Sequence, residues 1–159
     1  MNHPTTVERK SERELVITRT FDAPARIVFA AWTQPELIQR WWTPKSFEMS
    51  FVSCEVDART GGKYRFVFRH PAFEQPMAFF GRYVEVTPHS RLVWTNEEGA
   101  DGAVTTVTFE ENGGKTLLVL HELYPSKQAL EDALASGSPN AASEQYEALD
   151  EVLATLASS

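Results

Sequence analysis

In the N-terminal third of the chain, the spacing of apolar residues changes from every second residue, as in a strand, to about 3.6 residues, as in a helix. Segment 14–21, ELVITRTF, is β-branched and roughly alternates between polar and apolar residues, which predicts a β-strand. From Asp22 onward a helical spacing takes over, and Pro24 suits a first helical turn. The apolar positions that recur at this spacing are Ile27, Val28, Ala31 and Trp32. We therefore expect a strand followed by an amphipathic helix.

A second short helix is predicted over about residues 35–41. Thr33 and Glu36 have the spacing of a capping box, and Pro35 stands just inside it. The segment ends on the paired tryptophans Trp41 and Trp42. Both rings cannot face inward from one short helix, so we expect one to pack under the sheet and the other to line an opening.

The middle of the chain, from Phe47 to Leu123, has the signature of an antiparallel sheet. Short runs with strand character are separated by turn signals, and Asn112-Gly-Gly114 is a strong hairpin signal. Together with 14–21 this makes about seven strands, and their mostly short connections require antiparallel pairing. The strands of this region are expected at 47–56, 63–69, 77–86, 91–96, 104–109 and 116–123.

The segment 63–69 shows the two faces of this sheet most clearly. Tyr64, Phe66 and Phe68 fall on one face, and basic residues occupy the other. These basic residues are Lys63, Arg65 and Arg69. We interpret them as a solvated outer face and the aromatic row as either core or the wall of a cavity.

Helical periodicity returns at the C-terminal end. Ser126 is placed to cap a short helix that stops at Gly137, and Ser138-Pro139 can begin a longer one. The apolar stripe of the longer helix is Ala142, Tyr146, Leu149, Leu153 and Leu156. This spacing indicates an amphipathic helix of about four turns that can cover an apolar sheet face.

These elements predict an α+β fold in which a curved antiparallel sheet wraps around a long C-terminal helix. A strongly twisted sheet curls, and its apolar face must be covered. The two short helices after the first strand can close one end of the curl. We expect a single domain over residues 14–157, preceded by a flexible tail at residues 1–13.

Composition narrows the function classes. The net charge is −7, which argues against nucleic-acid binding, because phosphate contacts need clustered Lys and Arg. The sequence has no apolar run long enough for a membrane span. It has one cysteine, so no intramolecular disulfide can form and a cytoplasmic setting fits. We expect a monomer or a weak homodimer.

Candidate chemistry is sparse. His121, near the end of a strand, could be a polar anchor or general base in a cavity, or a hydrogen-bonded structural residue. Glu85 could face a cavity with a raised pKa, or face solvent. No metal-ligand spacing, phosphate loop or dinucleotide fingerprint occurs, so we predict no metal and no cofactor.

Several stretches together resemble a known family over most of the chain. The chain is similar to the helix-grip (START-like) superfamily, also called SRPBCC. Within it, the chain resembles bacterial relatives of the C-terminal domain of the activator of the ninety-kilodalton heat-shock protein's ATPase. The resemblance implies a hydrophobic cavity between sheet and helix, but no fixed reaction. The stretches are 21–33 (FDAPARIVFAAWT), 40–44 (RWWTP), 57–66 (DARTGGKYRF), 81–86 (GRYVEV), 91–95 (RLVWT) and 121–126 (HELYPS).

The leading hypothesis is therefore binding of a small hydrophobic molecule (a lipid, an aromatic or a polyketide-like compound), without catalysis. The predicted lining consists of inward-facing strand residues and two helical residues, and no arginine is expected to point inward. It comprises Trp41, Phe51, Tyr64, Phe66, Phe68, Phe79, Tyr83, Val107, His121 and Tyr146.

Two alternatives stay open. The first is a chaperone-interaction module of the stress response, as the resemblance suggests, for which the acidic loop from Glu97 to Asp101 is the available docking patch. The second is a cyclase or hydrolase of aromatic or polyketide-like substrates, which would use His121, Glu85 or Tyr83.

Overall fold

The structure is a computed structural model that describes residues 5–43, 48–97, 102–136 and 138–157. Strands and helices follow one another in the predicted order, with one additional strand at the start. They are β1 (Thr6–Arg9), β2 (Glu14–Phe21), α1 (Ala25–Thr33), α2 (Pro35–Trp41), β3 (Ser50–Val56), β4 (Lys63–Arg69), β5 (Met77–Thr87), β6 (Arg91–Thr95), β7 (Val104–Asn112), β8 (Lys115–Leu123), α3 (Lys127–Ser136) and α4 (Ser138–Ala157).

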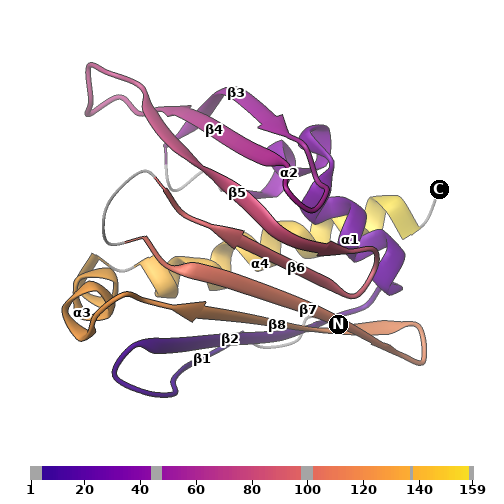
Figure 1. Ribbon diagram of the computed structural model, residues 1–159. Helices are drawn as coiled ribbons and strands as arrows, with labels where there is room; N and C mark the ends of the chain where they lie inside the picture. The colour runs from indigo at the N-terminus through magenta and orange to yellow at the C-terminus, as the bar shows by residue number, and fades with distance from the viewer. Residues whose placement is uncertain (1–4, 44–47, 98–101, 137, 158–159) are drawn as a thin grey trace.

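All strands belong to one curved antiparallel sheet (Figure 1). Its order is β1-β2-β8-β7-β6-β5-β4-β3, so β2 lies between β1 and β8, and β8 to β3 follow one another in reverse chain order. The predicted fold class is confirmed, although the sheet has eight strands rather than about seven.

The additional strand, β1, lies inside the segment expected to be a flexible tail. Thr6–Arg9 pairs antiparallel with β2, and Val7 lies opposite Ile17. All four residues of β1 are exposed, so the strand is held by backbone hydrogen bonds and buries no apolar face. The expectation of a structureless tail over residues 1–13 is therefore wrong for β1, because its sequence lacks the apolar alternation by which strands are recognised.

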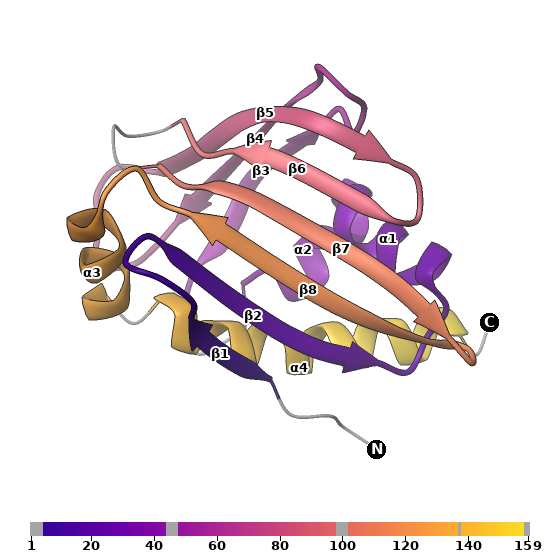
Figure 2. The same cartoon turned by 60° about the horizontal axis from the view of Figure 1, so that its bottom comes forward.

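Helix α4 runs across the concave side of the sheet (Figure 2). Its apolar stripe is buried as predicted: Tyr146, Leu149 and Leu153 are each at most 2% exposed. Helices α1 and α2 pack against α4 and also contact the sheet, α1 at β7 and β8 and α2 at β3, so they close one end of the curl. The space enclosed by these three helices and strands β4 to β6 contains the site described below.

The helix ends differ in part from the sequence prediction. Pro24 precedes α1 rather than lying in its first turn. The predicted capping box is wrong: Gln34 occupies the N-cap position of α2 without a side-chain hydrogen bond, and the Thr33 hydroxyl donates to the Phe29 carbonyl at 2.9 Å. The Ser126 cap is confirmed, because its Oγ accepts a hydrogen bond from the Ala129 N–H at 3.1 Å.

Parts of three predictions lie outside the described residues. Phe47 was the expected start of strand 47–56, and Gly137 was the expected end of the helix that begins near Ser126. Most of the acidic loop from Glu97 to Asp101 also lies outside them.

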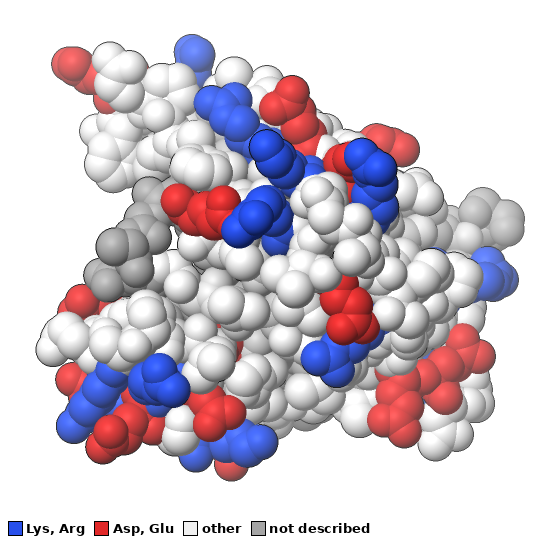
Figure 3. Space-filling model, viewed as in Figure 1, with Lys and Arg blue, Asp and Glu red and all other residues white. Residues whose placement is uncertain are grey.

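The outer face of β4 carries the expected charges. Lys63, Arg65 and Arg69 are exposed, whereas the aromatic residues between them are buried. Figure 3 shows basic side chains gathered over this part of the sheet together with acidic ones. On the neighbouring strand β5, the exposed Arg82 donates a hydrogen bond to Glu97 at 2.8 Å. The basic cluster is thus a solvated sheet face.

One charge does point inward, against expectation. Arg19 lies on the same face of β2 as the core residues Ile17 and Phe21, is 3% exposed and forms an ion pair with Asp150 of α4. The Arg19 Nη1–H also donates to the Thr5 hydroxyl at 2.7 Å. The prediction that no arginine faces inward is therefore wrong, and the inner face of the sheet includes a buried ion pair between β2 and α4.

Candidate functional site

A cavity of about 330 Å³ lies between strands β4 to β6 and the three helices α1, α2 and α4. The helical side supplies Trp32 from α1, Trp42 and Thr43 from the end of α2, and Gln145 from α4. Gln145 Nε2 donates to the Trp42 carbonyl at 2.7 Å, which joins α4 to the end of α2 at the cavity wall. Met49, just before β3, completes this side.

The sheet supplies the opposite wall, which is almost entirely aromatic. Strand β4 contributes every second residue, so its inward row faces the cavity. Strand β5 adds two rings, and β6 adds Trp94 followed by Asn96. The residues from β4 and β5 are Tyr64, Phe66, Phe68, Phe79 and Tyr83.

These five are half of the predicted lining, so strand periodicity placed them correctly. Four of them are buried, and Phe79 is 37% exposed at the rim of the cavity. Between Tyr83 and Glu85 a bulge shifts the register of β5 against β6. Tyr83 consequently stays inside while Glu85 faces outward, where its carboxylate lies 3.5 Å from Arg91.

The other predicted residues do not line the cavity. Val107 and Tyr146 are buried in the core beside it, at 0% and 2% exposure. Phe51 packs against the rings of Phe66 and Phe68, with centroids 5.8 and 4.6 Å away. Trp41 is buried, and its Nε1–H donates to the Ala31 carbonyl at 2.9 Å. One tryptophan of the pair packs and the other lines the opening, as expected, but Trp42 rather than Trp41 has the lining role.

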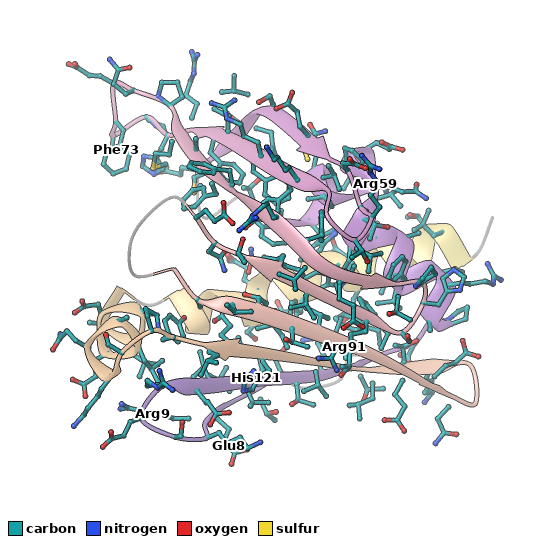
Figure 4. The ribbon with its side chains drawn as sticks, in the orientation of Figure 1. Glu8, Arg9, Arg59, Phe73, Arg91 and His121 are labelled. Atoms are coloured by element: carbon teal, nitrogen blue, oxygen red, sulfur yellow. The ribbon has the colours of Figure 1, made fainter. Side chains whose placement is uncertain are left out.

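His121 is also misplaced by the prediction. The inward residues of β8 are the even-numbered ones, so His121 projects from the opposite face. Its Nε2 lies 2.7 Å from the Glu14 carboxylate of the neighbouring strand β2. This hydrogen bond lowers the pKa of Glu14. Figure 4 shows the labelled side chain beside β2 and β8. His121 therefore joins two strands and is no part of the cavity.

Sequence reasoning missed seven lining residues. Trp42 was expected as one of two alternatives for the opening, but the predicted lining contained Trp41 in its place. Gln145 is a polar residue directly beside the stripe residue Tyr146 of α4. This position next to the stripe is the signal that could have suggested it as a polar residue of the cavity. The complete missed set is Trp32, Trp42, Thr43, Met49, Trp94, Asn96 and Gln145.

Close backbone packing fixes one polar edge of the wall. The Tyr64 hydroxyl donates to the Thr95 carbonyl at 2.7 Å and lies 3.2 Å from Asn96 Oδ1. A Cβ atom at Gly81 would stand 1.9 Å from the same Thr95 oxygen and 3.0 Å from the Tyr64 hydroxyl. Glycine is therefore required at this position for the strands and the tyrosine to meet.

The cavity is electrically neutral. Among the described residues that line it, none carries a charge at neutral pH. Burial raises the pKa of Tyr83, so its hydroxyl stays protonated. The described part of the chain also brings no group of three or more His, Cys, Asp or Glu together for a metal ion. The site is suited to binding through rings and hydrogen bonds.

Comparison with known proteins identifies the family. The family model described as Activator of Hsp90 ATPase homolog 1-like protein matches residues 22–154. The chain belongs to this family. No curated protein matches the sequence. The expected resemblance to this family is therefore confirmed over residues 22–154.

Solved structures share the fold of this AHSA1-like chain. A Rhodobacter sphaeroides protein is 24% identical, with a TM-score of 0.86 over 96% of this chain and 99% of that one. A Nitrosomonas europaea protein is 22% identical, with a TM-score of 0.84 over 95% and 100%. An AHSA1-like protein from Aeromonas hydrophila is 18% identical, with a TM-score of 0.63 over 82% and 90%. At these identities the similarity establishes the architecture alone. No described helix is long and apolar enough to span a membrane.

Proposed function

We propose that this AHSA1-like domain binds a small, mainly apolar molecule in the cavity between sheet and helices. The observation that carries the proposal is the cavity itself, at about 330 Å³ with mostly aromatic walls. Ligand sites in proteins typically span roughly 300–1,000 Å³ and combine apolar walls with a few polar groups. Here the polar groups are the side chains of Tyr64, Tyr83, Asn96 and Gln145.

The walls are supported from behind by further rings, which favours a preformed site. Trp32 packs on Trp41 with ring centroids 4.8 Å apart, and Phe66 packs on Phe51 at 5.8 Å. Rings held in this way lose little freedom when a ligand enters, so less of the binding free energy is spent on ordering the site. A cavity kept open by packed rings is better explained by an occupant than by imperfect core packing, because protein interiors are normally close-packed.

Two other functions have weaker support. The family description names an activator of the Hsp90 ATPase, which makes a chaperone the second candidate partner. The catalytic alternative required His121, Glu85 or Tyr83. His121 pairs with Glu14, Glu85 faces outward beside Arg91, and Tyr83 alone lines the cavity. No acid–base pair therefore converges on the cavity from these residues.

A ligand screen with matched variants tests the proposal. A ligand at about 100 times its dissociation constant stabilises the fold by roughly 2.7 kcal/mol, which raises Tm by about 5–10 °C in a domain of this size. Gln145→Trp places an indole in the cavity from α4, whereas Glu147→Trp places one on the exposed side of the same helix. We expect only Gln145→Trp to weaken binding measured by calorimetry.

Failure of every neutral apolar compound to raise Tm would contradict the proposal and favour the chaperone. Equal ligand affinity in both tryptophan variants would place the binding site elsewhere.

A further inference from the structure

Trp32 combines two properties that point to a ligand. It lines the cavity, and it is only 4% exposed. Its Nε1–H is buried and has no hydrogen-bond partner among the described residues. By contrast, the neighbouring Trp41 Nε1–H is satisfied by the Ala31 carbonyl. Buried polar groups in proteins are nearly always paired, so an unpaired donor beside a cavity indicates where an acceptor is bound.

Three other polar side chains of the lining already use their donors within the protein. Asn96 Nδ2 donates to the Ala103 carbonyl at 2.6 Å, and Gln145 Nε2 donates to the Trp42 carbonyl. The Tyr64 hydroxyl donates to the Thr95 carbonyl. The only other buried side-chain atom without a partner in the described chain is Arg19 Nε, which is not part of the lining. Among the described residues that line the cavity, the Trp32 indole is therefore the fully buried donor that is left without an acceptor.

Shape and charge restrict what carries the acceptor. The described lining contains eight aromatic rings but no Leu, Ile or Val, and aromatic walls favour flat rings through stacked and edge contacts. A cavity of about 150 Å³ in another protein accepts benzene, so about 330 Å³ accommodates roughly two rings. A charged group would lose its hydration here without gaining a counter-charge.

We infer that the ligand is a neutral, flat, two-ring aromatic compound whose oxygen accepts a hydrogen bond from Trp32 Nε1. This inference rests on the proposed function and specifies its ligand class. The hydrogen bond removes the cost of leaving the indole donor unpaired, so it adds selectivity for an oxygen-bearing ring system over a hydrocarbon of equal shape.

Two probes of nearly identical shape isolate this hydrogen bond. Naphthyl methyl ketone has a carbonyl oxygen where isopropenylnaphthalene has a methylene group. We expect the ketone to bind about tenfold more tightly, the usual worth of one such hydrogen bond. We also expect the indole N–H signal of Trp32, assigned by its loss in Trp32→Phe, to shift downfield with the ketone and not with the alkene.

Two variants separate the donor from the ring. Trp32→Phe removes the unpaired N–H, and we expect the tenfold preference for the ketone to vanish. Trp94→Phe removes an indole from the same cavity but leaves the Trp32 donor in place, so the preference should persist. The ratio of two affinities within one variant does not depend on how stable that variant is.

The outcomes distinguish this inference from the proposal beneath it. Equal binding of ketone and alkene to the unmodified protein, or a preference that survives in Trp32→Phe, would overturn the inference and leave the cavity as a binding site. Binding of dodecanol but of neither naphthyl probe would also overturn it, in favour of an acyl chain. If none of the three compounds binds, the proposed function fails as well.

Discussion

Replacing Leu149 by alanine tests whether α4 is the central element of the fold. Leu149 lies in the middle of the apolar stripe, is 0% exposed and belongs to the main core cluster. Truncating a fully buried leucine removes its apolar contacts and leaves a cavity that the surroundings only partly fill. The expected loss is about 2–5 kcal/mol in the free energy of unfolding.

Urea and thermal unfolding measure this loss. In a domain of this size about 2–5 kcal/mol corresponds to a fall in Tm of roughly 5–20 °C. Leu117→Ala is the matched control, because the same atoms are removed from a leucine that is 37% exposed on the outer face of β8. We expect the control to lose less than half as much.

A loss below about 1 kcal/mol for Leu149→Ala would refute the reasoning. It would mean that the helix contributes little to the core, and the enclosed cavity would then lack its α4 wall.

Three further predictions concern buried polar groups. Arg19→Met alone should destabilise by about 3–5 kcal/mol in urea, because it leaves Asp150 without its buried counter-charge, and adding Asp150→Leu should recover much of the loss. Burial raises the pKa of Glu122 above its usual 4.5, so the fold favours the neutral carboxyl. Glu122→Gln should therefore stabilise the protein at about pH 8, and this gain should disappear as the pH falls to about 4, which unfolding at both pH values will show. Burial also raises the pKa of Cys54 to about 11, so alkylation by iodoacetamide followed by mass spectrometry should be about a hundredfold slower in the folded than in the unfolded protein.

The sequence predicted the fold well because its strongest signals are local. In 63–69 the alternation of basic and aromatic residues defines both faces of β4, and the structure places Tyr64, Phe66 and Phe68 on the inner one. The four-three spacing along α4 likewise defined its buried stripe. Both patterns depend only on the geometry of one element.

The misplaced residues depend on information that one element does not contain. In β8 the run Leu117, Leu118 and Val119 is apolar on both faces. The sequence therefore does not show whether the odd-numbered or the even-numbered residues face inward, and His121 was predicted on the wrong face. Arg19 points inward because of Asp150, its partner from α4, 131 residues later in the chain.

The choice between Trp41 and Trp42 depends on how α2 meets α1 and α4. Trp41 reaches the Ala31 carbonyl, while the Trp42 carbonyl accepts from Gln145. Neither contact has a signature in the sequence of α2.

The pairing of β2 with β8 also determines when the protein can fold during synthesis. Glu14 and His121 join these strands although they are 107 residues apart. Ribosomes add roughly 5–20 residues per second, so β2 waits about 5–20 s for its partner to emerge. Throughout that interval its core residues Leu15, Ile17 and Phe21 have no sheet to join, and contacts this distant in the chain form slowly. The nascent chain is therefore exposed to aggregation through its first long strand until the last strand has been translated.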